Sequence, residues 1–225
     1  MNWWNEFLAN PAISEKLPVA TLETLGMVAF ASFWTALVGL PLGLVLHATG
    51  KGGTRPVPVL YAALSAVVNI GRAIPFIILI ILLIPVTRAV VGTPLGWQAA
   101  VLPLAVGAVP FYARLVETSA REVAPGKIEA ALMVGASRLR MTGGVIVREA
   151  LPSLIAGFTV TVIALVGYSA MAGAVGGGGL GFLAITYGYQ RFDAAVMFAA
   201  VIVILAIVFL IQFLGDRAAR LVDHR

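Results

Sequence analysis

Hydrophobic residues form stretches in this chain that are much longer than the core of a soluble protein requires. Four stretches contain no Asp, Glu, Lys or Arg: residues 24–50, 89–113, 150–190 and 194–215. A fifth stretch, residues 57–86, is interrupted only by Arg72. Because a membrane-spanning helix needs about 20 mostly apolar residues, this pattern predicts an all-α integral membrane protein.

The stretch 150–190 is long enough for two spans, but glycine is concentrated in its middle. Glycine is unfavourable inside a helix, so we expect one span that is followed by a glycine-rich loop. The chain then has five spans in a single transmembrane domain, residues 1–225. The expected spans are residues 20–47, 58–86, 89–113, 152–174 and 194–215, with a long loop at 114–151.

Composition agrees with this class of protein. Hydrophobic residues make up 60% of the chain and charged residues only 11%, and the mean hydropathy is +1.01. Soluble proteins carry about 25% charged residues, so a soluble enzyme or a disordered chain is excluded. Cysteine is absent, which excludes disulfides and cysteine metal sites.

A net charge of +5 would at first suggest nucleic acid as a partner. The basic residues are instead divided unevenly between the two sides of the predicted spans. Eleven Lys and Arg residues lie on one side and three on the other, and only Arg72 lies within a span. Because basic residues are retained on the cytoplasmic side, we expect an external N-terminus, a cytoplasmic C-terminus and no nucleic-acid partner.

The cytoplasmic loop 114–151 contains ten of the 25 charged residues. Its middle is amphipathic, with Ile128, Ala131, Leu132 and Gly135 at the spacing of one helical face. The Gly-Ala-Ser sequence that begins at Gly135 should end this helix, and Ser137 can cap a second short helix. A helical hairpin of this size is suited to docking into a groove on a partner protein.

Glu129, Ala130 and Ala131, with Gly135 four residues later, resemble the EAA motif of importer-type ABC transporter permeases. In that family the motif forms a coupling helix that contacts the ATPase, and it lies before the penultimate span, as here. The alternative is an ordinary amphipathic surface helix, because Glu and Ala are common helix formers.

Three longer segments extend the resemblance: NIGRAIPFIIL, LVGYSAMAGAVGGGGLG and YGYQRFDAAVM. They are similar to the permease subunits of methionine ABC importers, and the similarity covers nearly the whole chain. One departure is that the stretch before Leu151-Pro152 lacks the additional Leu-Pro pair common in that family. This departure concerns the shape, but not the existence, of the second short helix, which would be a second coupling helix.

The resemblance implies a permease of the bacterial inner membrane that imports L-methionine, and the D-form as well. Its partners would be a second copy of itself, two ATPase subunits, an extracytoplasmic methionine-binding protein and membrane lipid. Alternatives are a permease for another small amino acid or an ion-coupled secondary transporter. The latter often has internal repeats and intramembrane carboxylates, and neither is evident. A membrane enzyme is a third alternative, but it would need a cluster of reactive polar residues.

No cofactor is expected to bind this chain. A phosphate-binding loop of the G-x-x-x-x-G-K-[ST] type is absent from the sequence, so ATP and Mg²⁺ would be used by the partner ATPase. The glycine run at 176–181 is interpreted as a close-packed loop. His47 and His224 are far apart in the sequence and are expected near membrane interfaces, so neither a metal site nor a catalytic residue is predicted.

Five residues are candidates for the translocation pathway or its gate. Arg72 is costly inside a membrane, so it would line the pathway, or else lie near the headgroups if its span begins late. Asn69 could contact substrate or form a hydrogen bond between helices. Tyr168, Ser169 and Met171 lie in the fourth predicted span, and Met171 could form a soft apolar gate.

Overall fold

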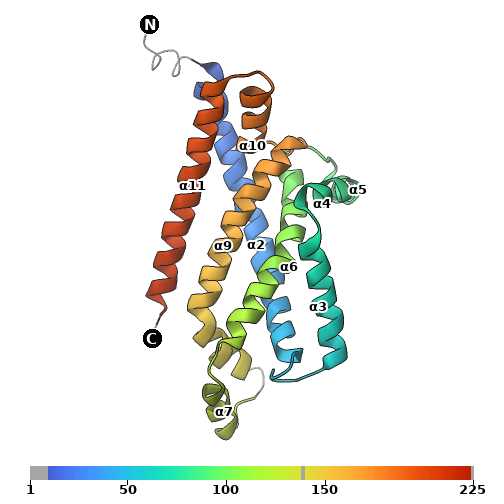
Figure 1. The fold of residues 1–225 in the computed structure, drawn as a ribbon, viewed down its shortest axis with the longest axis vertical. Helices are drawn as coiled ribbons and strands as arrows, with labels where there is room; N and C mark the ends of the chain where they lie inside the picture. The colour runs from blue at the N-terminus through green and yellow to red at the C-terminus, as the bar shows by residue number, and fades with distance from the viewer. Residues whose placement is uncertain (1–9, 138–139, 224–225) are drawn as a thin grey trace. The chain divides into compact units, whose positions relative to one another are not determined.

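The computed structural model describes residues 10–137 and 140–223. Every element in this part of the chain is helical (Figure 1). Three π-helical segments are Ala12–Lys16 (η1), Met141–Ile146 (η2) and Ala184–Tyr189 (η3). The α-helices are α2 (Leu17–Thr49), α3 (Pro58–Ala73), α4 (Phe76–Leu82), α5 (Ile84–Val91), α6 (Trp97–Arg121), α7 (Pro125–Met133), α9 (Val147–Ala174), α10 (Gly179–Leu183) and α11 (Ala194–Leu221).

Four continuous helical stretches are long and apolar enough to cross a membrane. They are Ala12–Thr49, Trp97–Arg121, Met141–Ala174 and Ala194–Leu221. The pair α3 and α4, bent by 102°, passes this test together, so the number is five if the pair is counted as one broken span. The predicted all-α membrane fold is therefore confirmed.

The second predicted span, residues 58–86, is not one continuous helix. It breaks between Ala73 and Phe76, where Pro75 lacks an N–H group and disfavours a helical conformation at Ile74. The chain resumes as α4 and α5, and α5 ends at Gly92 with a φ of 86°. The next helix, α6, then begins at Trp97, whereas the sequence pattern placed the start of this span at residue 89.

Two spans are longer than expected at the ends that flank the 114–151 loop. α6 continues to Arg121 instead of ending at residue 113, and the helical stretch that contains α9 begins at Met141 instead of residue 152. Charged residues can continue a helix beyond the apolar region, so the end of an apolar stretch does not mark the end of the helix. Pro152 consequently lies inside α9 and not at a helix start.

The chain divides into two compact units, each made of three separate segments. One unit comprises Met1–Phe33, Ile74–Gly107 and Val162–Ile211, and the other Trp34–Ala73, Ala108–Thr161 and Gln212–Arg225. We call them the glycine-loop unit and the charged-cluster unit. In the charged-cluster unit, a buried core joins α6 to α9 and to the segment that precedes α9. Its residues are Tyr112, Val116, Ala120, Val123, Ile146, Ala150 and Leu154.

Close helix packing in the charged-cluster unit depends on two glycines. A Cβ atom on Gly43 in α2 would lie 2.5 Å from the carbonyl oxygen of Ala113 in α6. On Gly71 in α3, a Cβ atom would lie 2.7 Å from Cγ of Pro110. Both distances are too short for a side chain, so these glycines let α2 and α3 approach α6 closely.

Large apolar side chains are exposed along several helices. On α11, Phe198, Phe209 and Phe213 are more than half exposed, as is Val59 on α3. Single exposed hydrophobic residues are normal on soluble proteins, but entire helix faces of this kind are typical of lipid contact. The membrane assignment therefore agrees with the surface as well as with the sequence.

Candidate functional site

The EAA-like sequence lies on the short helix α7. Pro125 occupies its first turn, and α7 ends at Met133. Gly135 then has a φ of 75°, a conformation that residues other than glycine adopt only at a cost. The N–H group of Arg140 donates a hydrogen bond of 3.4 Å to Oγ of Ser137. The break at Gly135 and a cap at Ser137 are therefore confirmed, but the second helix is not short, because η2 continues without a break into α9.

Most of α7 is exposed. Glu129 and Ala130 are exposed, and Ala131 is half-buried. Only Ile128 packs against the core of the charged-cluster unit. At the end of the helix, Met133 and Val134 are 88% and 84% exposed. On the predicted apolar face, Ile128 thus contacts the core whereas Leu132 is 52% exposed, and Met133 adds another exposed apolar side chain one turn after Glu129.

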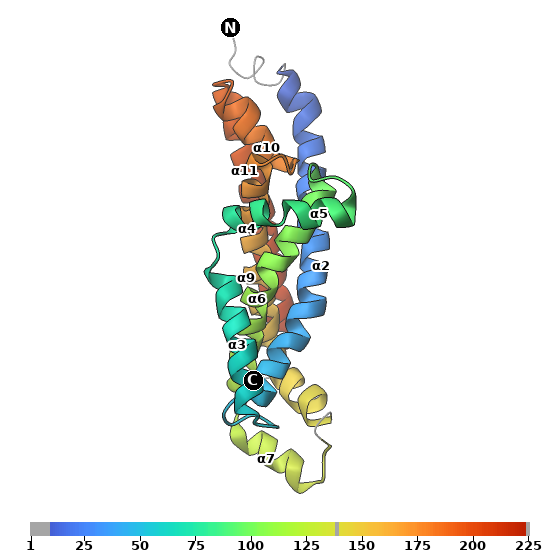
Figure 2. The same ribbon diagram turned by 90° about the vertical axis from the view of Figure 1, so that its right-hand side faces the viewer.

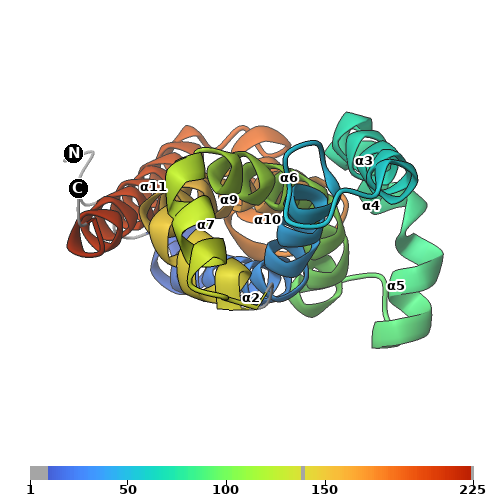
Figure 3. The same ribbon diagram turned by 90° about the horizontal axis from the view of Figure 1, so that it is seen from below.

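Polar contacts hold the beginning of the α7 segment to α9. The ammonium group of Lys127 pairs with the carboxylate of Glu149. Oγ of Ser153 donates a hydrogen bond of 3.3 Å to Glu122. Figures 1 and 3 show α7 beside η2, the segment that leads into α9. These contacts connect the α7 segment to a long helix.

A charged cluster lies at the C-terminal part of α6. Glu117 is only 1% exposed, although the sequence pattern places it in a solvated loop. Its Oε2 atom is 2.5 Å from Nη1 of Arg114, and its Oε1 atom pairs with Arg121. The hydroxyl group of Tyr61, on α3, donates a hydrogen bond of 3.1 Å to the same Oε1. Glu117 thus has two positive partners and a neutral donor.

Arg114 extends this cluster along α3. Its Nη2 atom donates hydrogen bonds to Oγ of Ser65 at 2.9 Å and to Oδ1 of Asn69 at 2.8 Å. Figure 2 shows α3 running beside this part of α6. Of the two roles considered for Asn69, the structure contains the hydrogen bond between helices; substrate contact stays a prediction. We define the charged cluster as Tyr61, Ser65, Asn69, Arg114, Glu117 and Arg121.

The importance of Glu117 was missed in the sequence because it was assigned to the loop. Its signal is the spacing of Arg114, Glu117 and Arg121, which places both cations one turn from the carboxylate. A buried carboxylate requires partners of opposite charge or hydrogen-bond donors, because desolvation is costly. The spacing alone could have suggested that Glu117 is paired, but only tertiary packing shows that it is buried.

Two other polar residues in the charged-cluster unit differ in environment. Arg72 is exposed at the end of α3, next to the helix break, and pairs with no carboxylate in the described part of the chain. His47 is buried against protein in the last turn of α2, and neither of its ring nitrogens has a hydrogen-bond partner within residues 10–137 and 140–223; its position near a membrane interface stays a prediction. His224 lies outside the described residues.

In the ranges described, no group of three or more His, Cys, Asp or Glu side chains could hold a metal ion.

Tyr168, Ser169 and Met171 belong to the glycine-loop unit and have separate environments. The ring of Tyr168 stacks on Phe76, with centroids 4.7 Å apart and planes 9° apart. Ser169 is buried and donates a hydrogen bond of 2.7 Å to the carbonyl oxygen of Val166, one turn earlier. Met171 is 48% exposed. Of the three, Met171 has the side chain most available to another molecule.

The glycine-rich segment after α9 packs closely, as the sequence predicted. A Cβ atom on Gly173 would overlap the backbone of Gly181 and Phe182. The N–H group of Gly179 donates a hydrogen bond of 2.7 Å to Glu23, and that of Leu180 donates one of 2.8 Å to Oγ1 of Thr24. The segment is therefore fixed to α2 by its own backbone.

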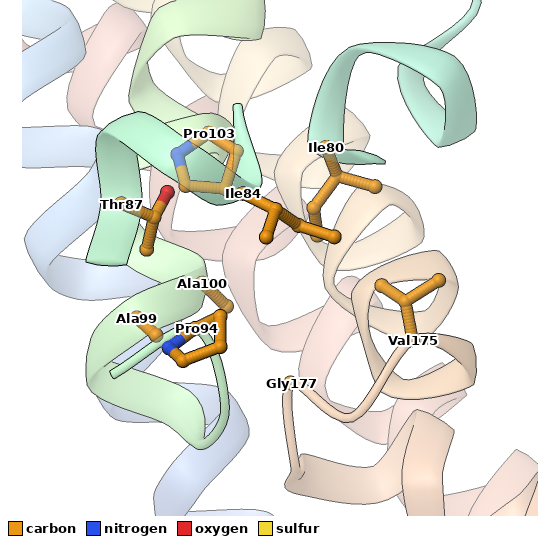
Figure 4. Close-up of a pocket in the computed structure, with 9 residues that line it drawn as sticks. All are labelled: Ile80, Ile84, Thr87, Pro94, Ala99, Ala100, Pro103, Val175 and Gly177. Carbon is orange, nitrogen blue, oxygen red and sulfur yellow. The ribbon is translucent and has the colours of Figure 1, made fainter. Parts of the chain in front are cut away.

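A small apolar cavity of about 20 Å³ lies near this segment (Figure 4). Thr87 and Ala99 line it, and the Thr87 hydroxyl has no partner among the described residues. Pro103, which also lines the cavity, has no N–H group with which to pair the carbonyl oxygen of Ala99. This volume is enough for one water molecule but too small for a substrate.

Comparison with known proteins places these features in a family. The family described as binding-protein-dependent transport system inner membrane component matches residues 39–225. A Vibrio cholerae protein named probable D-methionine transport system permease protein is 48% identical over 212 residues, which are 94% of each chain. A Bacillus subtilis protein named methionine import system permease protein is 48% identical over 206 residues, 92% of this chain and 93% of the other.

A solved structure is also similar over nearly the whole chain. It shows inward-facing conformations of a methionine ABC transporter and matches with a TM-score of 0.91 at 46% identity. The match covers 93% of this chain and 98% of the chain in that structure.

Proposed function

Since the chain belongs to the family of binding-protein-dependent transport system inner membrane components, we propose that it is the permease subunit of an ATP-driven ABC importer for methionine. The relatives named for methionine import and for D-methionine transport support this cargo. They favour import of the L- and D-forms over another small amino acid, and they do not favour an ion-coupled secondary transporter. The protein is an inner-membrane protein with several spans.

The exposed helix α7 carries the proposal of ATP-driven transport. Glu129 and Ala130 are accessible to a partner, and the contacts from Lys127 and Glu122 connect the α7 segment to α9. A separate ATPase would bind Mg²⁺ and ATP, since the sequence has no phosphate-binding loop. Movement of the ATPase would then be passed through α7 to the long helices.

The proposed assembly contains two copies of this chain, two ATPase subunits and an extracytoplasmic methionine-binding protein. Within each copy, residues 1–225 act as one permease domain. The excess of basic residues around α7 supports a cytoplasmic position for this helix. We further propose that Asn69, Arg72, Tyr168, Ser169 and Met171 line or organise the pathway, with Met171, which is 48% exposed, as a gate residue.

Charge reversal on α7 tests the coupling role. Glu129→Arg should lower transport-coupled ATPase activity about tenfold, because it places a like or unpaired charge at a protein contact. The protein should still fold, since Glu129 is exposed. Arg55→Glu, a charge reversal at another exposed position on the predicted cytoplasmic side but outside α7, is the matched control. Unchanged coupling in Glu129→Arg would contradict the assignment of α7.

Uptake of labelled methionine into vesicles tests the cargo and the energy source together. Vesicles that contain this chain and its ATPase should accumulate methionine only when ATP is present on the ATPase side and the binding protein on the opposite side. Equal uptake without ATP would contradict an ABC mechanism. Accumulation of a different amino acid under the same conditions would contradict only the cargo.

A further inference from the structure

A second cavity, of about 210 Å³, lies in the glycine-loop unit, between the start of α2 and the segment that follows the glycine run. It is distinct from the small cavity beside Thr87. Its lining combines charged and apolar side chains. The residues that matter for recognition are Glu15, Lys16, Glu23, Phe182, Leu183 and Tyr187.

The wall of the cavity on the Glu23 side is held in place. Oε2 of Glu23 accepts the hydrogen bond from the N–H group of Gly179. Oγ1 of Thr24 accepts the neighbouring bond from Leu180. Among the residues that the structure describes, Glu23 accepts this one bond, which leaves its carboxylate with further capacity to accept hydrogen bonds from a ligand. Glu15 adds a second negative charge to the same cavity.

The opposite charge is supplied around Tyr187. The ammonium group of Lys16 contacts the Tyr187 hydroxyl and lies 4.6 Å from the centroid of its ring. The guanidinium group of Arg191 lies 4.3 Å from the centroid of the same ring. Positive groups are therefore gathered around one wall of the cavity, and carboxylates are present in its lining. Phe182, which is 41% exposed, and Leu183 add an apolar surface.

We infer that this cavity is an external subsite for a free α-amino acid with an apolar side chain. Glu23 and Glu15 would bind the ammonium group, and Lys16 the carboxylate. Phe182 would contact the side chain, and a thioether is favourable beside an aromatic ring. Cavities for drug-sized ligands have volumes of about 300–1,000 Å³, so this smaller one suits an amino acid. The inference rests on the proposed function as an amino-acid importer.

The position of the cavity fits a step that precedes translocation. The start of α2 and the segment after the glycine run both lie on the side of the membrane predicted to be external by the Lys and Arg distribution. An amino acid released there by the binding protein would be retained near the mouth of the pathway.

Direct binding measurements without the binding protein test this subsite. The complex of this chain with its ATPase, in lipid nanodiscs, would be titrated with labelled L-methionine. Glu23→Gln and Lys16→Met should each weaken binding about tenfold, since each removes one charge-assisted contact. Glu23→Gln keeps an oxygen that can accept the Gly179 hydrogen bond, so this variant should remain folded. Lys51→Met, which removes an exposed lysine outside the cavity, is the matched control.

Two analogues assign the charges to their partners. Methionine methyl ester lacks the carboxylate, so Lys16→Met should no longer weaken its binding, whereas Glu23→Gln still should. The deaminated acid should show the reverse pattern. Failure of the wild-type complex to bind methionine, or equal binding by all variants, would overturn the subsite.

Two further results distinguish an amino-acid subsite from a docking surface and from a failure of the proposed function. If Glu23→Gln and Lys16→Met weaken only the binding of the binding protein, the cavity is a docking surface, and the inference is wrong. If the wild-type chain imports no methionine with ATP and binding protein present, the proposed function fails instead. Normal wild-type import together with unaltered methionine binding by the variants would contradict the subsite alone.

Discussion

The charged cluster around Glu117 and the glycine-rich segment after α9 both connect helices, but they do so by opposite means. In the cluster, long side chains span the distance between α3 and α6, and every contact depends on a particular polar group. In the glycine-rich segment, backbone lies against backbone, because no Cβ atom separates Gly173 from Gly181. The charged cluster therefore depends on particular polar side chains, whereas the glycine-rich segment depends on the lack of side chains at its glycines.

This difference predicts how each region responds to substitution. A charged cluster at the end of a helix can rearrange, because its arginines are partly exposed: the side chains of Arg114 and Arg121 are 20% and 49% exposed. If one partner is removed, water molecules can form some of the hydrogen bonds that the partner made with these arginines. A backbone contact has no comparable freedom, since moving it displaces the helices themselves. The glycine-rich segment should therefore be the more sensitive region.

Gly173→Ala should give the largest effect. The new methyl group would overlap the backbone of Gly181 and Phe182, and the displacement should cost about 3 kcal/mol. We expect a large loss of folded protein, measured as the monodisperse fraction after detergent extraction and as the thermal unfolding midpoint. Gly167→Ala, on the same helix, has no atom within 4 Å of the new Cβ and serves as the control. Equal yields of the two variants would contradict the packing argument.

Glu117→Ala should have an intermediate effect. It leaves Arg114 and Arg121 without their shared carboxylate, and loss of a buried ionic partner usually costs about 3–5 kcal/mol. Since both arginines reach solvent, we expect a smaller cost of about 2 kcal/mol here, measured as a lower thermal unfolding midpoint of the purified protein. Glu129→Ala, which removes an exposed carboxylate on α7, should change the midpoint little. A drop for Glu117→Ala larger than that for Gly173→Ala would reverse the ranking of the two regions.

The smallest effect concerns a charge contact near the glycine-rich segment. The hydrogen bond from Lys16, together with the nearby positive charges of Lys16 and Arg191, holds the pKa of Tyr187 below its ordinary value of 10.0. Lys16→Met should raise that pKa, so Tyr187 would lose its proton only at higher pH. Carbon-13 NMR of labelled tyrosine, followed from pH 7 upward, would measure the change. If the pKa of Tyr187 is the same in Lys16→Met as in the wild-type protein, Lys16 is not the cause of its lowered value.

The helical character of the chain was predictable because a membrane imposes a simple requirement. Every backbone N–H and C=O group in lipid must be paired within the protein, so a long apolar stretch must be helical. Turn chemistry was also predictable, as at Gly135 and Ser137, because it depends on neighbouring residues. Helix ends were harder to place. α6 and α9 extend into charged sequence, and hydropathy does not report whether a charged residue continues a helix.

Whether a site residue could be predicted from the sequence depended on how near in the chain the residues lie that determine its environment. The segment from Glu129 to Gly135 was recognised from its spacing, its place in the charged loop and its resemblance to the EAA motif, and it forms an exposed helix followed by a left-handed glycine. The burial of Glu117 was not foreseen, because it requires Tyr61, more than 50 residues away, to approach the same carboxylate. The Glu23 contact with Gly179 spans an even longer separation, |i−j| = 156. No periodicity in a single chain records such pairings.

By itself, the sequence determined the membrane class, the approximate spans, the expected orientation and the exposed α7 segment. These follow from properties that each stretch carries alone: its length, hydropathy, charge and local turn residues. Tertiary structure decided which charges are buried, where the second span breaks, and how the glycine-rich segment joins α2. Those features arise from contacts between distant segments, and their free energy depends on close packing and desolvation, which exist only once the helices have come together.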